Sequence, residues 1–116
     1  MSVHDTPSAE QLVEAVREWL ERDVLNGTTG RLQFHTRVAV NVLSMVEREL
    51  RLGAGQAVAH AARLAQLGCG DDAELAVRIR DGSLDERLDE VRELVRDDVR
   101  DKLAVANPKY LADEKG

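Results

Sequence analysis

The chain has 116 residues, of which 43% are hydrophobic and 33% charged, so it is long enough for one globular domain over residues 1–116 and is not disordered. Its net charge of −6 argues against nonspecific nucleic-acid binding, which depends on neutralising phosphates with basic side chains. Aromatic residues make up only 3%, so the core must consist of Leu, Val and Ala, which favours packed helices over a sheet. We therefore predict an all-α fold, a compact bundle of four or five helices.

The cysteine content and the first residues indicate the compartment. The single cysteine, Cys69, excludes an intrachain disulfide and suits a reducing cytoplasm. The opening residues lack the basic and then apolar pattern of a signal peptide, and no apolar run approaches the ~20 residues that span a bilayer. We expect a cytoplasmic protein that binds neither membranes nor nucleic acid. Since no base is identifiable near Cys69, we interpret it as a free structural thiol.

The first helix is predicted from Thr6-Pro7, which has the pattern of an N-cap followed by proline at the first helical position. It runs to about Leu25 and ends at the turn-forming residues 26–30, where Asn and Gly tolerate left-handed backbone angles. Its apolar face would consist of Leu12, Val13, Val16, Trp19, Leu20 and Val24.

The second helix is predicted over residues 31–52, because its apolar residues recur at helical spacing, and Gly53 is expected to end it. The third helix, residues 54–67, is rich in alanine, which would let a neighbouring helix approach closely. A break at residues 68–70 follows. The apolar arc of the second helix consists of Leu32, Phe34, Val38, Ala39, Val42, Leu43, Met45 and Val46.

Two further helices complete the predicted fold. A short one, capped by Asp71 or Asp72, runs through Arg80. The last helix is predicted to start at Ser83, where Glu86 three residues later gives the spacing of a capping box.

The last helix ends at Asn107-Pro108, because a residue before proline avoids the α region. Tyr110-Leu111 is expected to fold back onto the core. We expect the first, second and last helices to form the core, with the third helix packed through its alanines.

A row of polar side chains borders the apolar arc of the second helix. Arg37, Asn41 and Arg48 share one side of it, so two guanidinium groups about three turns apart could hold a carboxylate or a phosphate. The alternative is that both arginines pair with acids of the first or last helix. If the row binds a partner or ligand, Arg37 and Arg48 should reach solvent, and Asn41, nearer the apolar edge, should be partly buried.

His35 lies inside the apolar arc, about one turn after Arg31. We expect it to be structural and to face the interior or a dimer seam, with a role at the floor of a ligand site as the alternative. It stands more than about 90° from the two arginines on the helix, so one helix cannot direct all three at one small ligand. The other histidines, His4 and His60, show no paired ligand spacing, and no metal site is predicted.

Motifs for catalysis or cofactor binding do not occur in the sequence. There is no glycine-rich phosphate loop after a strand, no GxSxG and no recognisable Ser/His/Asp arrangement. The carboxylates stand in ion-pair patterns such as Asp89/Arg92 and Asp98/Lys102. We therefore predict no catalytic residue and no cofactor, and interpret the chain as a protein that is not an enzyme.

Three segments are distinctive together: the opening DTPSAEQLVEAVREWLERDV, the central RLQFHTRVAVNVLSMVEREL and the terminal VRDKLAVANPKYL. Together they resemble the small bacterial DUF6285 family. The resemblance implies a small companion of aminoglycoside-phosphotransferase-like kinases and acyl-CoA dehydrogenases, and in one similar system an accessory subunit of a 4-hydroxyacyl-CoA kinase. It carries no catalytic residue over to this chain.

Three functional hypotheses follow. The first is a non-catalytic accessory subunit that binds and activates a kinase acting on hydroxyacyl-CoA, and its partner is implied by the resemblance alone. The second is a stand-alone binder of an anionic small molecule such as an acyl-CoA, held at Arg37, Asn41 and Arg48 with His35 at the floor. The third is a structural homodimer that buries the second or third helix against its own copy.

Overall fold

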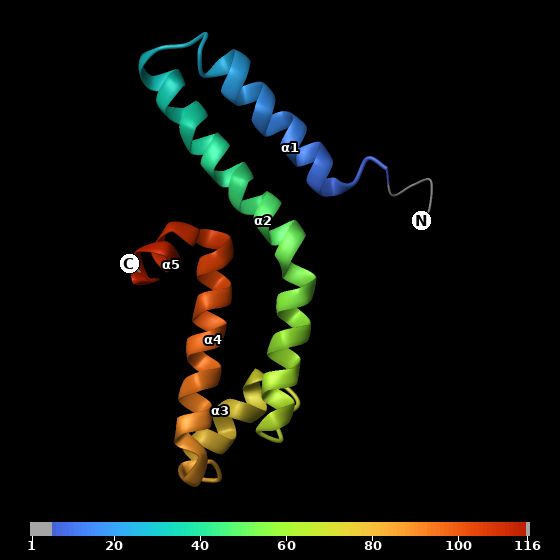
Figure 1. Ribbon diagram of the computed structural model, residues 1–116, viewed down its shortest axis with the longest axis vertical. Coiled ribbons are helices and arrows are strands. Elements are labelled where there is room, and N and C mark those ends of the chain that lie inside the picture. The colour runs from blue at the N-terminus through green and yellow to red at the C-terminus, as the bar shows by residue number, and fades with distance from the viewer. Residues whose placement is uncertain (1–5, 116) are drawn as a thin grey trace. The chain divides into compact units, whose positions relative to one another are not determined.

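The computed structural model describes residues 6–115, with the side chains of residues 6–111 (Figure 1). Among these residues there is no strand, so the predicted all-α fold of four or five helices is confirmed. A π-helical turn, Leu20–Val24, extends the first helix, and a 3-10 turn, Asp85–Arg87, precedes the fourth. The five α-helices are α1 (Ala9–Trp19), α2 (Gly30–Gln66), α3 (Asp72–Arg80), α4 (Leu88–Ala106) and α5 (Pro108–Lys115).

The chain divides into two compact units, Met1–Gly53 and Ala54–Gly116, and the boundary falls inside α2. The single domain predicted over residues 1–116 stays a prediction. No helix among the described residues combines the length and the apolar character that a membrane span requires.

The start of α1 differs from the sequence prediction. The N-cap is Ser8 rather than Thr6, so Pro7 precedes the helix instead of opening it. The Ser8 hydroxyl accepts a hydrogen bond from the Gln11 backbone N–H at 3.2 Å, and the Ser8 N–H donates to Gln11 Oε1 at 2.8 Å. Because these two bonds satisfy two otherwise unpaired N–H groups, this capping box prevails over the Thr-Pro signal.

The first helical segment extends as far as predicted, but its last turn is π-helical. The Leu25 N–H donates to Leu20 O at 2.8 Å, five residues back. The loop to α2 is then held by side chains, since Thr28 Oγ1 donates to Val24 O and Gln33 Nε2 donates to Leu25 O and Thr28 O. The chain therefore reverses within a few residues, and α1 and the first part of α2 form an antiparallel hairpin (Figure 1).

The prediction that Gly53 ends the second helix is wrong, because α2 continues without a break from Gly30 to Gln66. Glycine in a helix interior costs about 1 kcal/mol relative to alanine, which weakens a helix but does not stop it. A glycine that ends a helix commonly does so in the left-handed region, and neither Gly53 nor Gly55 has a positive φ. The alanine-rich segment that follows has high helix propensity and carries the helix on.

Helix α2 instead ends at Gly68, whose φ is +74°. The Gly68 N–H donates to Ala65 O at 3.0 Å, and the Cys69 N–H donates to Leu64 O at 2.9 Å. These are the two bonds of a Schellman motif. Cys69 and Leu64 are both buried, so the motif also joins the end of the helix to the core.

The buried apolar side chains all lie in the second unit, which corrects the prediction that the first, second and last helices form the core. Helix α1 contributes no buried residue. The alanines were also predicted wrongly: of those in residues 54–65, only Ala59 is half-buried and the others are exposed. The core consists of Leu64, Leu67, Cys69, Leu75, Leu84, Val91 and Leu94.

The first unit lacks such a core among its described residues, in which only Thr36 and Glu47 are buried. The apolar arc of the second helix was expected inside, yet most of it is exposed, and Phe34 is 62% exposed. A hairpin of two helices gives each helix only one covered face. In α2 that face is the one with Thr36 and Glu47, which leaves the apolar arc outside.

The C-terminal elements follow the sequence with three exceptions, one of which is the unpredicted helix α5. Asp71 caps α3 as predicted, accepting from the Glu74 N–H at 2.8 Å. Ser83 does not cap the next helix: its N–H donates to Asp81 Oδ1, and α4 starts only at Leu88. Helix α4 ends before Asn107-Pro108 as predicted, whereas Tyr110 is 62% exposed and does not fold back onto the core.

We expect Gly55→Ala to raise the stability of the protein by about 0.5–1 kcal/mol, because the position is helical and a new Cβ there meets nothing within 4 Å. Gly68→Ala is the matched control, just beyond the end of the same helix, and should destabilise, since its φ of +74° strains any other residue. Thermal melts followed by circular dichroism measure both effects. A loss of stability in Gly55→Ala would contradict a continuous α2.

Candidate functional site

The predicted polar row lies on one side of α2, within an arc of about 40° at 100° per residue. Arg37 is exposed, as expected for an interaction surface, and it forms no ion pair with any residue that the structure describes. Arg48 is half-buried, so it reaches solvent only in part. Asn41 is exposed, which corrects the prediction of partial burial, because the apolar edge beside it is itself uncovered. We call Arg37, Asn41 and Arg48 the donor stripe.

His35 is exposed, so the expectation that it faces the interior of this chain is wrong. Its Nε2 accepts a hydrogen bond from Arg31 Nε at 3.3 Å, one turn earlier on the same face, as the spacing predicted. The ring also meets Phe34 edge to face, with the centroids 5.6 Å apart. His35 and Arg37 point about 160° apart around the helix, so the structure does not bring them to one small ligand.

The interior of the hairpin is built around a charged pair that the sequence reasoning missed. Arg17 Nε on α1 binds Glu47 Oε2 on α2, and Arg17 Nη2 lies 3.3 Å from Glu47 Oε1. The hydrogen bonds to Glu47 and then to Glu21 raise the pKa of Arg17. Nearby, Arg51 Nη1 lies 3.7 Å from Glu10 Oε1. The two contacts thus join the helices in opposite senses, a base of α1 with an acid of α2 and an acid of α1 with a base of α2.

A second polar cluster joins three helices in the other unit. His60 of α2 lies between two carboxylates, with Nε2 2.7 Å from Asp72 Oδ1 of α3 and Nδ1 2.9 Å from Asp98 Oδ2 of α4. Both ring nitrogens can donate only in the imidazolium form. The hydrogen bond to Asp98 and then that to Asp72 raise the pKa of His60, and partial desolvation opposes them. The position of His60 between two carboxylates therefore favours its imidazolium form, in which it links α2 to α3 and α4.

Arg63, one turn after His60, extends this cluster along α4. Its Nη1 lies 2.8 Å from Asp98 Oδ1 and 3.0 Å from Asp101 Oδ2, and these bonds, first of all that to Asp101, raise its pKa. Gln56 Nε2 donates to Asp101 O at 2.9 Å. Asp98 was expected to pair with Lys102 on its own helix, whereas it faces His60 and Arg63. The equal spacing of His60/Arg63 and Asp98/Asp101 is the signal that could have revealed the contact.

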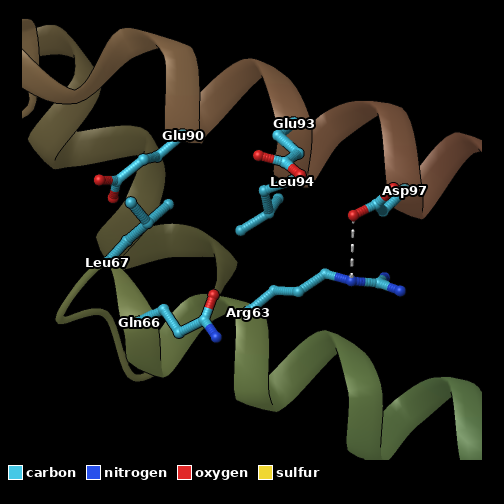
Figure 2. A pocket seen from close by; sticks show the side chains of 7 residues that line it. All are labelled: Arg63, Gln66, Leu67, Glu90, Glu93, Leu94 and Asp97. Carbon is cyan, nitrogen blue, oxygen red and sulfur yellow. Dashed lines mark ion pairs between the residues drawn. The ribbon is translucent and has the colours of Figure 1, made fainter.

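A small pocket opens beside Arg63, between the end of α2 and α4 (Figure 2). Its volume is about 150 Å³, below the roughly 300–1,000 Å³ of typical small-molecule sites. Arg63 reaches across it toward Asp97, at 3.9 Å, while acids dominate the remaining polar lining. The pocket therefore suits neither the size nor the charge of an acyl-CoA. It is lined by Arg63, Gln66, Leu67, Glu90, Glu93, Leu94 and Asp97.

Cys69 is 5% exposed, and its thiol points at Leu67 O, 3.7 Å away, within the core. This placement agrees with the interpretation of a structural thiol. In the part of the chain that the structure describes, no group of three or more His, Cys, Asp or Glu side chains could hold a metal ion. His4 lies outside the described residues.

Comparison with known proteins places the chain in a family. The model of a domain of unknown function, DUF6285, matches residues 26–110, about three quarters of the chain. The chain belongs to the DUF6285 family. Neither a curated protein nor a solved structure matches it. The DUF6285 match takes in α2, α3 and α4, and with them the donor stripe and the His60 cluster, whereas α1 and the opening segment of the resemblance lie outside it.

The His60 cluster predicts a pH-dependent stability. Because the folded pKa of His60 is raised above its ordinary value near 6.5, its contribution is complete below about pH 6.5 and is lost as the pH rises through the folded pKa. We expect His60→Gln to lower the melting temperature by a few degrees at about pH 6 and by less at about pH 9.

The matched control is His35→Gln, at an exposed histidine of the same helix, and it should change the melting temperature little at either pH. Melts followed by circular dichroism in low salt give both values. An equal effect of His60→Gln at the two pH values would contradict the charged clamp.

Proposed function

We propose that this DUF6285 protein is a cytoplasmic, non-catalytic accessory subunit of a phosphotransferase-like kinase that acts on hydroxyacyl-CoA. The identity of the kinase rests on the family resemblance alone. The observation that supports a binding role is the donor stripe, in which exposed Arg37 and Asn41 lie one turn apart on a long continuous helix.

The placement of the stripe favours a protein partner over a small ligand. Small-molecule sites are concave and enclose most of their ligand, whereas the donor stripe lies on the outer surface of a single helix. Arginine is enriched at protein interfaces, where its planar fork binds carboxylates through two parallel hydrogen bonds. Arg37 is exposed and forms no ion pair with the residues that the structure describes, and its helix is held in place by the Arg17–Glu47 pair. An acidic patch on the kinase is the complement that this stripe would take.

The test is co-expression with a kinase of this type encoded near the chain, followed by copurification and by phosphorylation of a hydroxyacyl-CoA with and without the chain. We expect copurification and a higher rate with the chain present. Arg37→Ala and Asn41→Ala should each weaken binding by about tenfold and leave the melting temperature unchanged, because both side chains are exposed.

The matched control is Arg92→Ala, which removes an exposed arginine of α4 from a loose pair with Asp89 and should leave kinase binding unchanged. The absence of both copurification and activation would overturn the proposal. Binding that persists in Arg37→Ala and Asn41→Ala would move the interface away from the donor stripe.

The second candidate function is binding of an anionic small molecule such as an acyl-CoA, and the exposed guanidinium of Arg37 is the observation that favours it. Calorimetry with a CoA ester, on the chain without any kinase, separates the two functions. This candidate expects saturable heat that Arg37→Ala abolishes. The accessory-subunit proposal expects no binding of the ester by the isolated chain.

A further inference from the structure

The hairpin leaves an apolar face of α2 uncovered on the side opposite α1. Phe34, Val38, Val42 and Met45 lie within an arc of about 80°. All four are exposed, Phe34 by 62% and Val42 by 50%. The face that contacts α1, marked by buried Thr36 and Glu47, is about 180° away. We call these four residues the apolar stripe.

The two ends of the apolar stripe carry opposite charges. Arg31 and Glu49 are about five helical turns apart, so they point in the same direction, close to the centre line of the stripe. Arg31 lies beyond one end of the stripe and Glu49 beyond the other. Both side chains are exposed. A basic end, an apolar middle and an acidic end form a pattern that complements its own copy when that copy runs in the opposite direction.

We propose that a second copy of this chain covers the apolar stripe, in an antiparallel pair of α2 helices related by a two-fold axis that crosses the seam at the level of residue 40. In this register Val38 of one copy lies opposite Val42 of the other, and Phe34 approaches Met45, whose sulfur is a favourable neighbour for an aromatic ring.

The same register places Arg31 of each copy beside Glu49 of the other, which makes two ion pairs per dimer. A parallel pair would bring Arg31 to Arg31 and Glu49 to Glu49, and a seam of this kind is disfavoured by like charges at both ends. The charges thus select the antiparallel arrangement, and the apolar stripe supplies the area to be buried. The seam is only about 27 Å long, so we expect a dimer of micromolar affinity.

The charge pattern can be tested by swapping it, with sedimentation velocity on the full chain over a range of concentrations. The wild type should be a dimer. Arg31→Glu and Glu49→Arg should each raise the dissociation constant by roughly tenfold, because two attractive pairs per dimer become repulsive. The double variant R31E/E49R should return to wild-type affinity.

Mixing the two single variants gives a second, independent readout. In a heterodimer of R31E with E49R, one copy carries a carboxylate at both positions and the other carries a guanidinium group at both, so both contacts are attractive again. An equimolar mixture should therefore dimerise about as tightly as the wild type, although neither component does alone. A parallel seam predicts a different result for the single variants: like charges would meet at both ends in the wild type and in each single variant, so neither substitution would weaken the dimer.

The apolar stripe is tested by Val42→Asp, which should abolish the dimer and leave the helix content unchanged, because Val42 is half exposed in the single chain. The matched control is Val58→Asp, at another valine of α2 that is 72% exposed and lies outside the stripe, and it should leave the dimer intact. Circular dichroism confirms that both variants fold.

Three results would overturn the proposal. They are a monomeric wild type at concentrations of hundreds of micromolar, a dimer that Val42→Asp does not weaken, and single charge variants that do not complement each other. A monomer would mean that the stripe is covered by the chain itself or by a different protein. These measurements use the chain alone, so their outcome is independent of the kinase proposal.

Discussion

The structure depends on which face of α2 its two neighbours occupy. Along residues 30–53 the covered face of α2 is the one on which Glu47 lies, and there Glu47 binds Arg17 of α1. In the second unit α2 and α4 share a buried apolar core that includes Leu64 and Leu94, and Arg63 and His60 of α2 both bind Asp98 of α4. The hairpin has only the ion pair with its hydrogen bonds, which requires a particular partner and register. Because this polar pair takes the covered face of α2 in the hairpin, the apolar side chains there are left at the surface.

The sequence predicted the elements better than their faces. Helical spacing, the Asp71 cap and the proline at position 108 gave the helix class and most boundaries correctly, because these signals are local. The helix through Gly53 was missed, since a glycine weakens a helix without ending it, and the choice depends on the residues around it. The cap at Ser8 prevailed over the Thr6-Pro7 signal because its reciprocal bonds with Gln11 satisfy more donors.

The candidate site was predicted only in part, because helix geometry gives the direction of a side chain but not which face of the helix is covered. Arg37 faces solvent as expected, because an exposed arginine at that angle follows from helix geometry alone. The exposure of His35 and Asn41 did not follow, because the sequence assigned the buried side of α2 by hydrophobicity. That assignment fails in a two-helix hairpin whose contact is made by Arg17 and Glu47. The His60 cluster was missed because its carboxylates come from α3 and α4, far away in sequence.

The donor stripe and the apolar stripe of α2 are related through the proposed dimer. The donor stripe lies about 80° around the helix from the centre of the apolar stripe, on the flank of the proposed seam. In an antiparallel pair the two-fold axis is perpendicular to both helices. The two flanks that carry Arg37, one in each copy, therefore lie on the same side of the seam. The donor stripes of both copies would then form one band that presents Arg37 and Asn41 of each chain. A single exposed arginine adds little to the affinity for a protein, whereas a band of this length matches an acidic surface at several points. Pairing through the apolar stripe would thus convert a sparse stripe into a binding surface, which is a physical reason for the two features to occur on the same helix.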